Sequence, residues 1–86
     1  MKHFTVEMRC FKTNDDIHTG LKKVFDFPDY YGANLDALHD ELTSITENVE
    51  VKLILADDQP LYFNKIIHVF EDSARENHHL KVEIKN

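Results

Sequence analysis

The spacing of hydrophobic residues in this chain changes several times, and each change predicts one secondary-structure element. Over positions 3–8 apolar and polar residues alternate, which predicts a first strand with one buried face formed by Phe4, Val6 and Met8. Positions 13–16 read as a helix capping box, and the apolar residues that follow have helical spacing: Ile17, Leu21, Val24 and Phe25. The sequence therefore predicts a helix despite Gly20 within it. Pro28 requires this helix to end near Phe25 or Asp26.

A second helix is predicted to begin at about Leu35. Gly32 supplies a turn position without a Cβ penalty, and Asn34 is suited to cap the first helical turn. The residues that recur at helical spacing form one apolar stripe that should belong to the core: Leu35, Leu38, Leu42 and Ile45. Asp36 and Asp40 lie roughly on the opposite side of this helix, with Thr43 beside them and His39 at the margin.

The second half of the chain predicts a strand, a long helix and a last strand. Positions 49–56 contain the continuous apolar run 53–56, which favours a central strand covered on both faces. After a polar turn at 57–60, a core stripe predicts a helix that ends near Asn77: Phe63, Ile66, Ile67, Phe70 and Ala74. Alternation at Leu80, Val82 and Ile84 predicts an edge strand. This β-α-α-β-α-β order predicts an α/β fold with a compact three-stranded parallel sheet packed with helices.

Length and composition limit the chain to one domain, residues 1–86, with a modest core. No run of eighteen apolar residues and no apolar leader occurs, so we expect a cytoplasmic protein without a membrane partner. Cys10 is the single cysteine, which excludes an internal disulfide. We expect it to be a small packed residue, with a reactive role as the alternative.

The negative charge is concentrated in one third of the chain. Between positions 24 and 51 there are seven acidic residues and no Lys or Arg, whereas ten basic residues face nine acidic ones elsewhere. Such a run is often only a solvated face. Here, however, Tyr30 and Tyr31 directly precede the acidic helix, and aromatic side chains beside concentrated charge are typical of a recognition surface.

The segment 28–42, PDYYGANLDALHDEL, closely resembles the signature of the barstar family, small intracellular inhibitors of secreted bacterial ribonucleases. The resemblance implies a single domain whose acidic helix blocks a ribonuclease active site, with carboxylates in place of RNA phosphates. Asp40 matches the central phosphate mimic, and Asp72 matches an acidic contact in the last long helix. The partner-binding residues that the resemblance implies are Tyr30, Gly32, Asn34, Asp36, His39, Asp40, Thr43 and Asp72.

The chain departs from the inhibitor that gives the family its name at three places. His39 and Ile45 stand where that inhibitor has tryptophans, so two large aromatic contacts are missing. The segment 56–61 is shorter and leaves no room for an additional helix found there in the family's best-known member.

Other chemistry is less well supported by the sequence. Asp36, His39 and Asp40 could approach one metal ion, but three candidates on one exposed helix without a distant fourth ligand make a weak site. A hydrolase using the two aspartates would need a concave site, and the chain has no Gly-rich phosphate loop, Ser elbow or CxxC motif. The acidic surface opposes nucleic-acid binding. We therefore predict a non-enzymatic inhibitor of a basic, barnase-like extracellular-type ribonuclease, without metal or cofactor; the alternative is a barstar-like module that binds a different basic protein.

Overall fold

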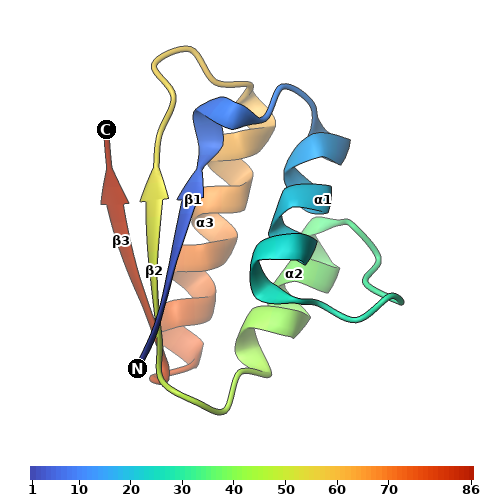
Figure 1. Ribbon diagram of the computed structural model, residues 1–86. Coiled ribbons are helices and arrows are strands. Elements are labelled where there is room, and N and C mark those ends of the chain that lie inside the picture. Colours follow the sequence, from blue (N-terminus) through green and yellow to red (C-terminus); the bar gives the residue numbers. More distant parts are fainter.

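The α/β fold predicted from the sequence is present in the computed structural model, which describes residues 1–86 (Figure 1). Three parallel strands and three α-helices follow the predicted order β-α-α-β-α-β, with one additional 3₁₀ turn after the first strand. The elements are β1 (Lys2–Glu7), η1 (Met8–Cys10), α1 (Asn14–Phe25), α2 (Leu35–Thr43), β2 (Val49–Ile54), α3 (Leu61–Glu76) and β3 (Leu80–Lys85).

Strand β2 is central, and β1 and β3 are the two edges of the sheet, as predicted. In the register of the sheet Val6 pairs with Leu53, and Leu53 with Ile84. The inward side chains of β2 are Val49, Val51 and Leu53, and all three are buried. These side chains form the sheet's contribution to the core.

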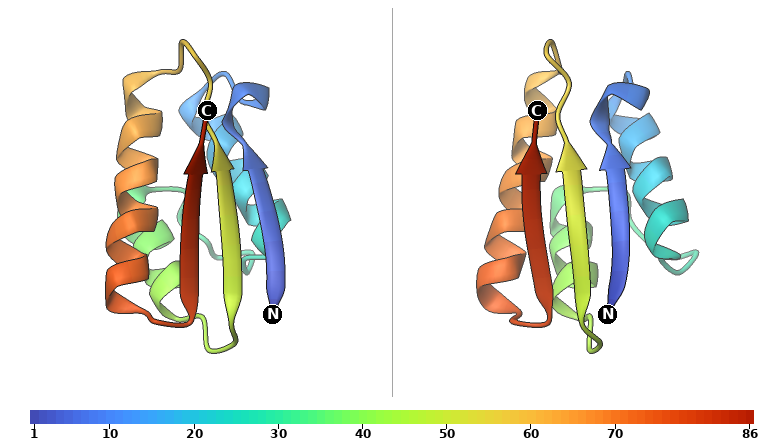
Figure 2. Two further views of the ribbon diagram at one scale, coloured as in Figure 1. Left: turned by 90° about the vertical axis from the view of Figure 1, so that its left-hand side faces the viewer. Right: turned by 60° about the vertical axis from the view of Figure 1, so that its left-hand side comes forward.

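All three α-helices cover the same face of the sheet (Figure 2). Each crossover connection, from β1 to β2 and from β2 to β3, adds its strand on the same side of the preceding strand. Because both crossovers are right-handed, their helices lie on the same face of the sheet. The expectation that β2 is covered on both faces was therefore wrong, because Glu50, Lys52 and Ile54 on its outer face are only half-buried.

Opposite charges lie beside one another on this outer face, since Lys52 pairs in register with Glu83 of β3.

The predicted apolar stripes of α2 and α3 meet the inner face of the sheet. Leu38 and Leu42 from α2 are fully buried, and so are Phe63, Ile66 and Phe70 from α3. Ile67 of α3 is also buried in this cluster, and three stripe residues pack against it as partly buried side chains: Leu35, Ile45 just beyond the end of α2, and Ala74. Burial of these stripes fixes which sides of α2 and α3 remain exposed.

Helix α1 begins and ends where the sequence predicts. The Thr13 side chain caps it by accepting the Asp16 amide at 3.1 Å. Gly20 is explained by packing, because a Cβ atom there would lie 2.3 Å from the Phe11 ring. After Phe25 the chain leaves the helix through Asp26, which takes the left-handed conformation at φ 55°.

Cys10 is exposed, so the expectation that it is packed was wrong. It ends the turn η1, which instead buries Met8, and its Sγ lies 3.8 Å from Glu7 Oε2. None of the helices has the length and apolar character needed to cross a bilayer.

Candidate protein-interaction face

The loop between α1 and α2 is anchored by a buried polar network. Tyr31 is 9% exposed, and its hydroxyl lies 2.6 Å from Nδ1 of His18, which is 2% exposed. The other ring nitrogen of His18 lies 2.7 Å from the hydroxyl of Tyr62 on α3. A neutral imidazole has one donor and one acceptor nitrogen, so one tyrosine donates and the other accepts. The loop is thereby tied to both α1 and α3.

Burial keeps this network uncharged. It lowers the pKa of His18 from its ordinary value, an effect that the nearby Asp15 carboxylate opposes. Burial also raises the pKa of Tyr31, with smaller contributions from Tyr62 and Glu41, and it raises the pKa of Tyr62. These groups act as a structural anchor, which leaves the neighbouring Tyr30 side chain free at 82% exposure.

The start of α2 is fixed by its own backbone and cap. Asn34 Oδ1 accepts the Ala37 amide at 2.8 Å, which confirms Asn34 as the N-cap. The left-handed residue of the turn is Ala33, at φ 52°, and not Gly32. At Gly32 the constraint is one of space, because a Cβ atom there would lie 3.1 Å from Asn34 Nδ2, a tight contact that only a small shift of this capping side chain could relieve. The cap and the turn together hold the first turn of α2 beside the exposed Tyr30.

Asp36 and Asp40 are exposed on α2, and neither has an ion-pair partner. Side chains from outside the acidic window reach only three of its seven carboxylates: Lys22 pairs with Asp29, Lys2 pairs with Glu47, and the His3 ring lies 4.0 Å from Glu50. The carboxylates without a partner are Asp26, Asp36, Asp40 and Glu41. The unbalanced charge therefore gathers on and beside α2. We call the exposed side of α2 with Asp36 and Asp40, together with Tyr30, the acidic face.

His39 and Thr43 lie at the side of α2 that faces α3. The His39 ring contacts the carboxylate of Glu76 on α3, and the Thr43 hydroxyl donates to the His39 carbonyl oxygen at 2.8 Å. His39 is thus directed away from the two aspartates. No group of three His, Cys, Asp or Glu side chains in the chain could hold a metal ion.

Helix α3 adds a second row of acidic residues next to α2. Asp72 is exposed and forms an ion pair with Arg75. Glu76 stands four residues further along the same helix, so Asp72 and Glu76 lie in one row along α3. The contact between Glu76 and His39 places this row beside α2. Sequence reasoning missed Glu76, although its i+4 spacing from Asp72 could have indicated it.

The C-terminal end of α2 is locked to α3 by a buried side chain. Asn77, 7% exposed, donates its amide hydrogens to the carbonyl oxygens of Leu42 at 3.0 Å and Ile45 at 2.9 Å. These bonds satisfy carbonyl groups at a helix end that would otherwise lack partners. The acidic face therefore lies on a helix that is capped at its start and hydrogen-bonded to the end of α3 at its own end.

The chain is similar to known proteins over almost its whole length. The family model described as Barstar (barnase inhibitor) matches residues 1–85. A protein of Bacillus subtilis (strain 168) with the name "Putative ribonuclease inhibitor YrdF" is 33% identical over 91 residues, a match that covers 99% of this chain and 96% of that relative.

Proposed function

Because this chain belongs to the barstar family, we propose that it is a proteinaceous inhibitor of a basic bacterial ribonuclease. In this proposal the acidic face of α2 enters the active site of the ribonuclease and substitutes carboxylates for RNA phosphates. The observation that supports it best is the exposure of Asp36 and Asp40 without ion-pair partners on a helix fixed at both ends.

The energetics of such a complex favour a preorganised acidic helix. Carboxylates that accept hydrogen bonds from Arg or Lys in a desolvated interface make short, charge-assisted contacts. A rigid α2 loses little conformational entropy on binding, so more of the electrostatic attraction appears as affinity. Tyr30 supplies exposed aromatic area beside the charges. Asn34 and Gly32 contribute indirectly, because they set the cap and the turn.

We propose that Asp40 is the central phosphate mimic, with Asp36 beside it and Asp72 on α3 as a more distant acidic contact. Asp72 must exchange its Arg75 partner for a basic group of the ribonuclease. His39 and Thr43 then border the contact on the α3 side, and Glu76 becomes an additional acidic neighbour. We further propose that the protein acts as an inhibitor and not as a catalyst, and that it acts in the cytoplasm.

Inhibition assays test this proposal. Basic ribonucleases encoded near the gene, or secreted by the source organism, are titrated with the purified protein, and we expect stoichiometric loss of activity of one of them. Asp40→Asn should abolish the effect. Asp57→Asn, at an exposed carboxylate in the β2–α3 loop, is the matched control and should inhibit normally. Full activity of every ribonuclease at saturating protein would contradict the proposal.

A second candidate is a barstar-like module whose basic partner is not a ribonuclease. The position of His39 supports this second candidate, because the His39 side chain contacts Glu76 of α3 and does not offer aromatic area to a partner. This reading predicts that no ribonuclease is inhibited, while a basic partner protein binds with a dependence on Asp36 and Asp40.

A further inference from the structure

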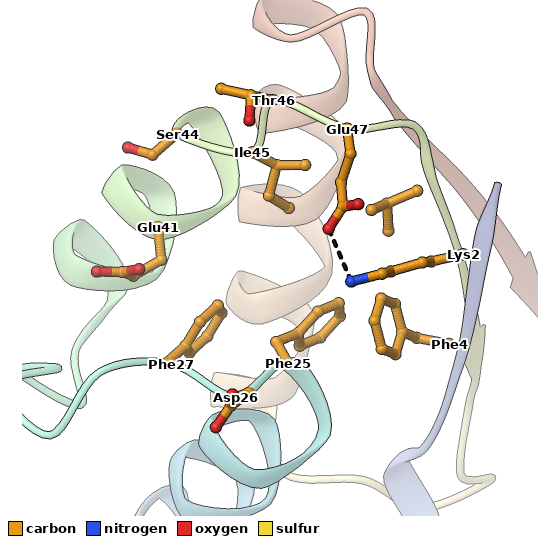
Figure 3. A pocket seen from close by; sticks show the side chains of 11 residues that line it. Lys2, Phe4, Phe25, Asp26, Phe27, Glu41, Ser44, Ile45, Thr46 and Glu47 are labelled. Carbon is orange, nitrogen blue, oxygen red and sulfur yellow. Dashed lines mark ion pairs between the residues drawn. The ribbon is translucent and has the colours of Figure 1, made fainter.

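A cleft of about 290 Å³ opens beside the C-terminal end of α2 (Figure 3). It lies among the start of β1, the end of α1, the end of α2 and the segment that leads into β2. Aromatic, aliphatic, acidic and hydroxyl side chains from these segments line it. We call it the side cleft.

The floor of the side cleft is aromatic. The rings of Phe4 and Phe25 have centroids 4.8 Å apart, and those of Phe25 and Phe27 lie stacked at 5.4 Å. Phe4 and Phe25 are only partly buried, so part of their ring surface is accessible. Figure 3 shows the three rings in a row, with Ile45 facing them across the cleft. A side chain with an apolar body fits this floor.

The charge around the floor is negative after internal pairing. Lys2 and Glu47 neutralise one another at 2.8 Å, at the Phe4 end of the row. Asp26 and Glu41 line the cleft and have no ion-pair partner. The last turn of α2 also contains no basic residue, so no positive charge on this turn offsets the negative end of its helix dipole.

The side cleft is continuous with the acidic face. Asp36, Asp40 and Ser44 follow one another at intervals of four, so they form one row along α2. This row ends at Ser44, which lines the cleft and donates its hydroxyl to the Asp40 carbonyl oxygen at 2.6 Å. A partner that covers Asp36 and Asp40 therefore reaches the cleft at Ser44, the C-cap residue of α2.

We propose that the side cleft binds an arginine side chain of the protein partner, as a second anchor beside the phosphate-mimicking aspartates. A guanidinium stacks on aromatic faces and is more weakly hydrated than an ammonium, so it suits phenylalanine rings bordered by Asp26 and Glu41. Its aliphatic stem packs against Ile45. This inference rests on the proposed function for the identity of the partner, whereas the chemistry of the cleft can be tested without it.

The test uses the isolated protein and a small probe. Backbone amide NMR spectra are recorded during titration with acetyl-arginine-amide and, separately, with acetyl-citrulline-amide, its neutral isostere. We expect saturable shifts at cleft residues with the arginine probe only. Glu41→Gln and Asp26→Asn should each weaken this binding by about two- to fivefold, the range for a partly exposed charge pair. Asparagine tolerates the left-handed conformation of position 26, so folding is preserved.

One further variant tests the aromatic part, and a second serves as the control outside the cleft. Phe25→Leu keeps an apolar floor but removes one ring face, and it should weaken the arginine probe with little effect on the fold. Asp57→Asn lies far along the chain and should change nothing. Absent or unsaturable shifts, or equal shifts with citrulline, would overturn the inference. Tighter cleft-confined binding of spermidine than of the arginine probe would also overturn it and indicate a site for free polyamines.

These outcomes are distinct from failure of the proposed function. If the cleft binds the arginine probe but no ribonuclease is inhibited, the cleft chemistry stands and the class of partner is wrong. If a ribonuclease is inhibited, Glu41→Gln should reduce affinity for it by a similar two- to fivefold factor. Unchanged affinity in that variant would overturn the role of the cleft while leaving the acidic face intact.

Discussion

The imidazole of His39 on α2 contacts the carboxylate of Glu76 on α3. These two residues are 37 positions apart in the chain, and their contact joins the two helices. The sequence predicted that His39 lies at the margin of the acidic side of α2. The structure shows why it stays at that margin: its ring is turned toward α3. Because α2 itself contains no Lys or Arg, Asp36 and Asp40 have no basic side chain to pair with on their own helix.

A double-mutant cycle measures the strength of this contact. His39→Ala, Glu76→Ala and the double variant are unfolded with urea at neutral pH, and the coupling free energy is obtained from the four values. Both side chains are substantially exposed, so we expect a coupling of about 0.2 to 1 kcal/mol in the free energy of unfolding. A coupling indistinguishable from zero would show that the contact does not hold α2 against α3.

The capping residues and apolar stripes were predictable because they depend on local sequence. Thr13 and Asn34 carry side chains that accept backbone amides within their own helical turn, and no distant residue is needed. Leu38 and Leu42 recur with the helical period, so their common side of α2 follows from geometry. The acidic side of α2 was predictable for the same reason.

Features that depend on tertiary arrangement were missed. The apolar run 53–56 predicted a strand covered on both faces, but coverage is decided by the direction in which successive crossovers advance. The network of His18, Tyr31 and Tyr62 unites residues from α1, a loop and α3, and no local pattern indicates that their polar atoms meet. The side cleft likewise exists only because four separate segments meet there.

Protonation of His18 gives the fold a dependence on pH. Its pKa is lowered in the native state, so the unfolded chain binds a proton first as the pH falls. The stabilising contribution is fully present above the ordinary pKa of about 6.5, and it is lost progressively as the pH falls below that value. We expect the free energy of unfolding, measured with urea, to decrease between about pH 7.5 and about pH 5.

The control for this prediction is His18→Gln, which retains a hydrogen-bonding side chain without titrating. The five remaining histidines are common to both proteins, so only the difference between the two pH profiles reports on His18. We expect the variant to have the shallower profile. Parallel profiles would show that His18 takes up its proton equally in the native and unfolded states.

The association rate should depend on salt. If the partner is basic, as we propose, the unpaired carboxylates on and beside α2 attract it before contact, and dissolved ions screen this attraction over distances of about 8 Å at physiological ionic strength. We expect stopped-flow association rates to fall as sodium chloride is raised from about 0.05 M to about 0.5 M, with a smaller change in dissociation. Rates that do not change over this range would contradict electrostatic steering by the acidic face.

Asp40→Asn should separate binding from folding. Asp40 is exposed, has no ion-pair partner and stands one turn from the like charge of Asp36, so its neutralisation should change the free energy of unfolding by no more than about 0.5 kcal/mol. Affinity should fall at least about thirtyfold, because the partner's basic groups stay buried without a counter-charge. Thermal unfolding and inhibition titrations of the same preparation measure both quantities.

Leu38→Ala is the matched change on the opposite side of α2. Leu38 is fully buried, so its truncation opens a cavity and should cost roughly 2 to 5 kcal/mol of stability. Inhibition by this variant should fall only in proportion to the unfolded fraction, since Asp36 and Asp40 are unchanged. We therefore expect opposite results from the two variants. Asp40→Asn should be stable but should not bind, whereas Leu38→Ala should be less stable but should bind through an unchanged acidic face when it is folded. If Asp40→Asn melts early, or binds its partner as tightly as the parent chain, α2 does not present the phosphate mimic that we propose.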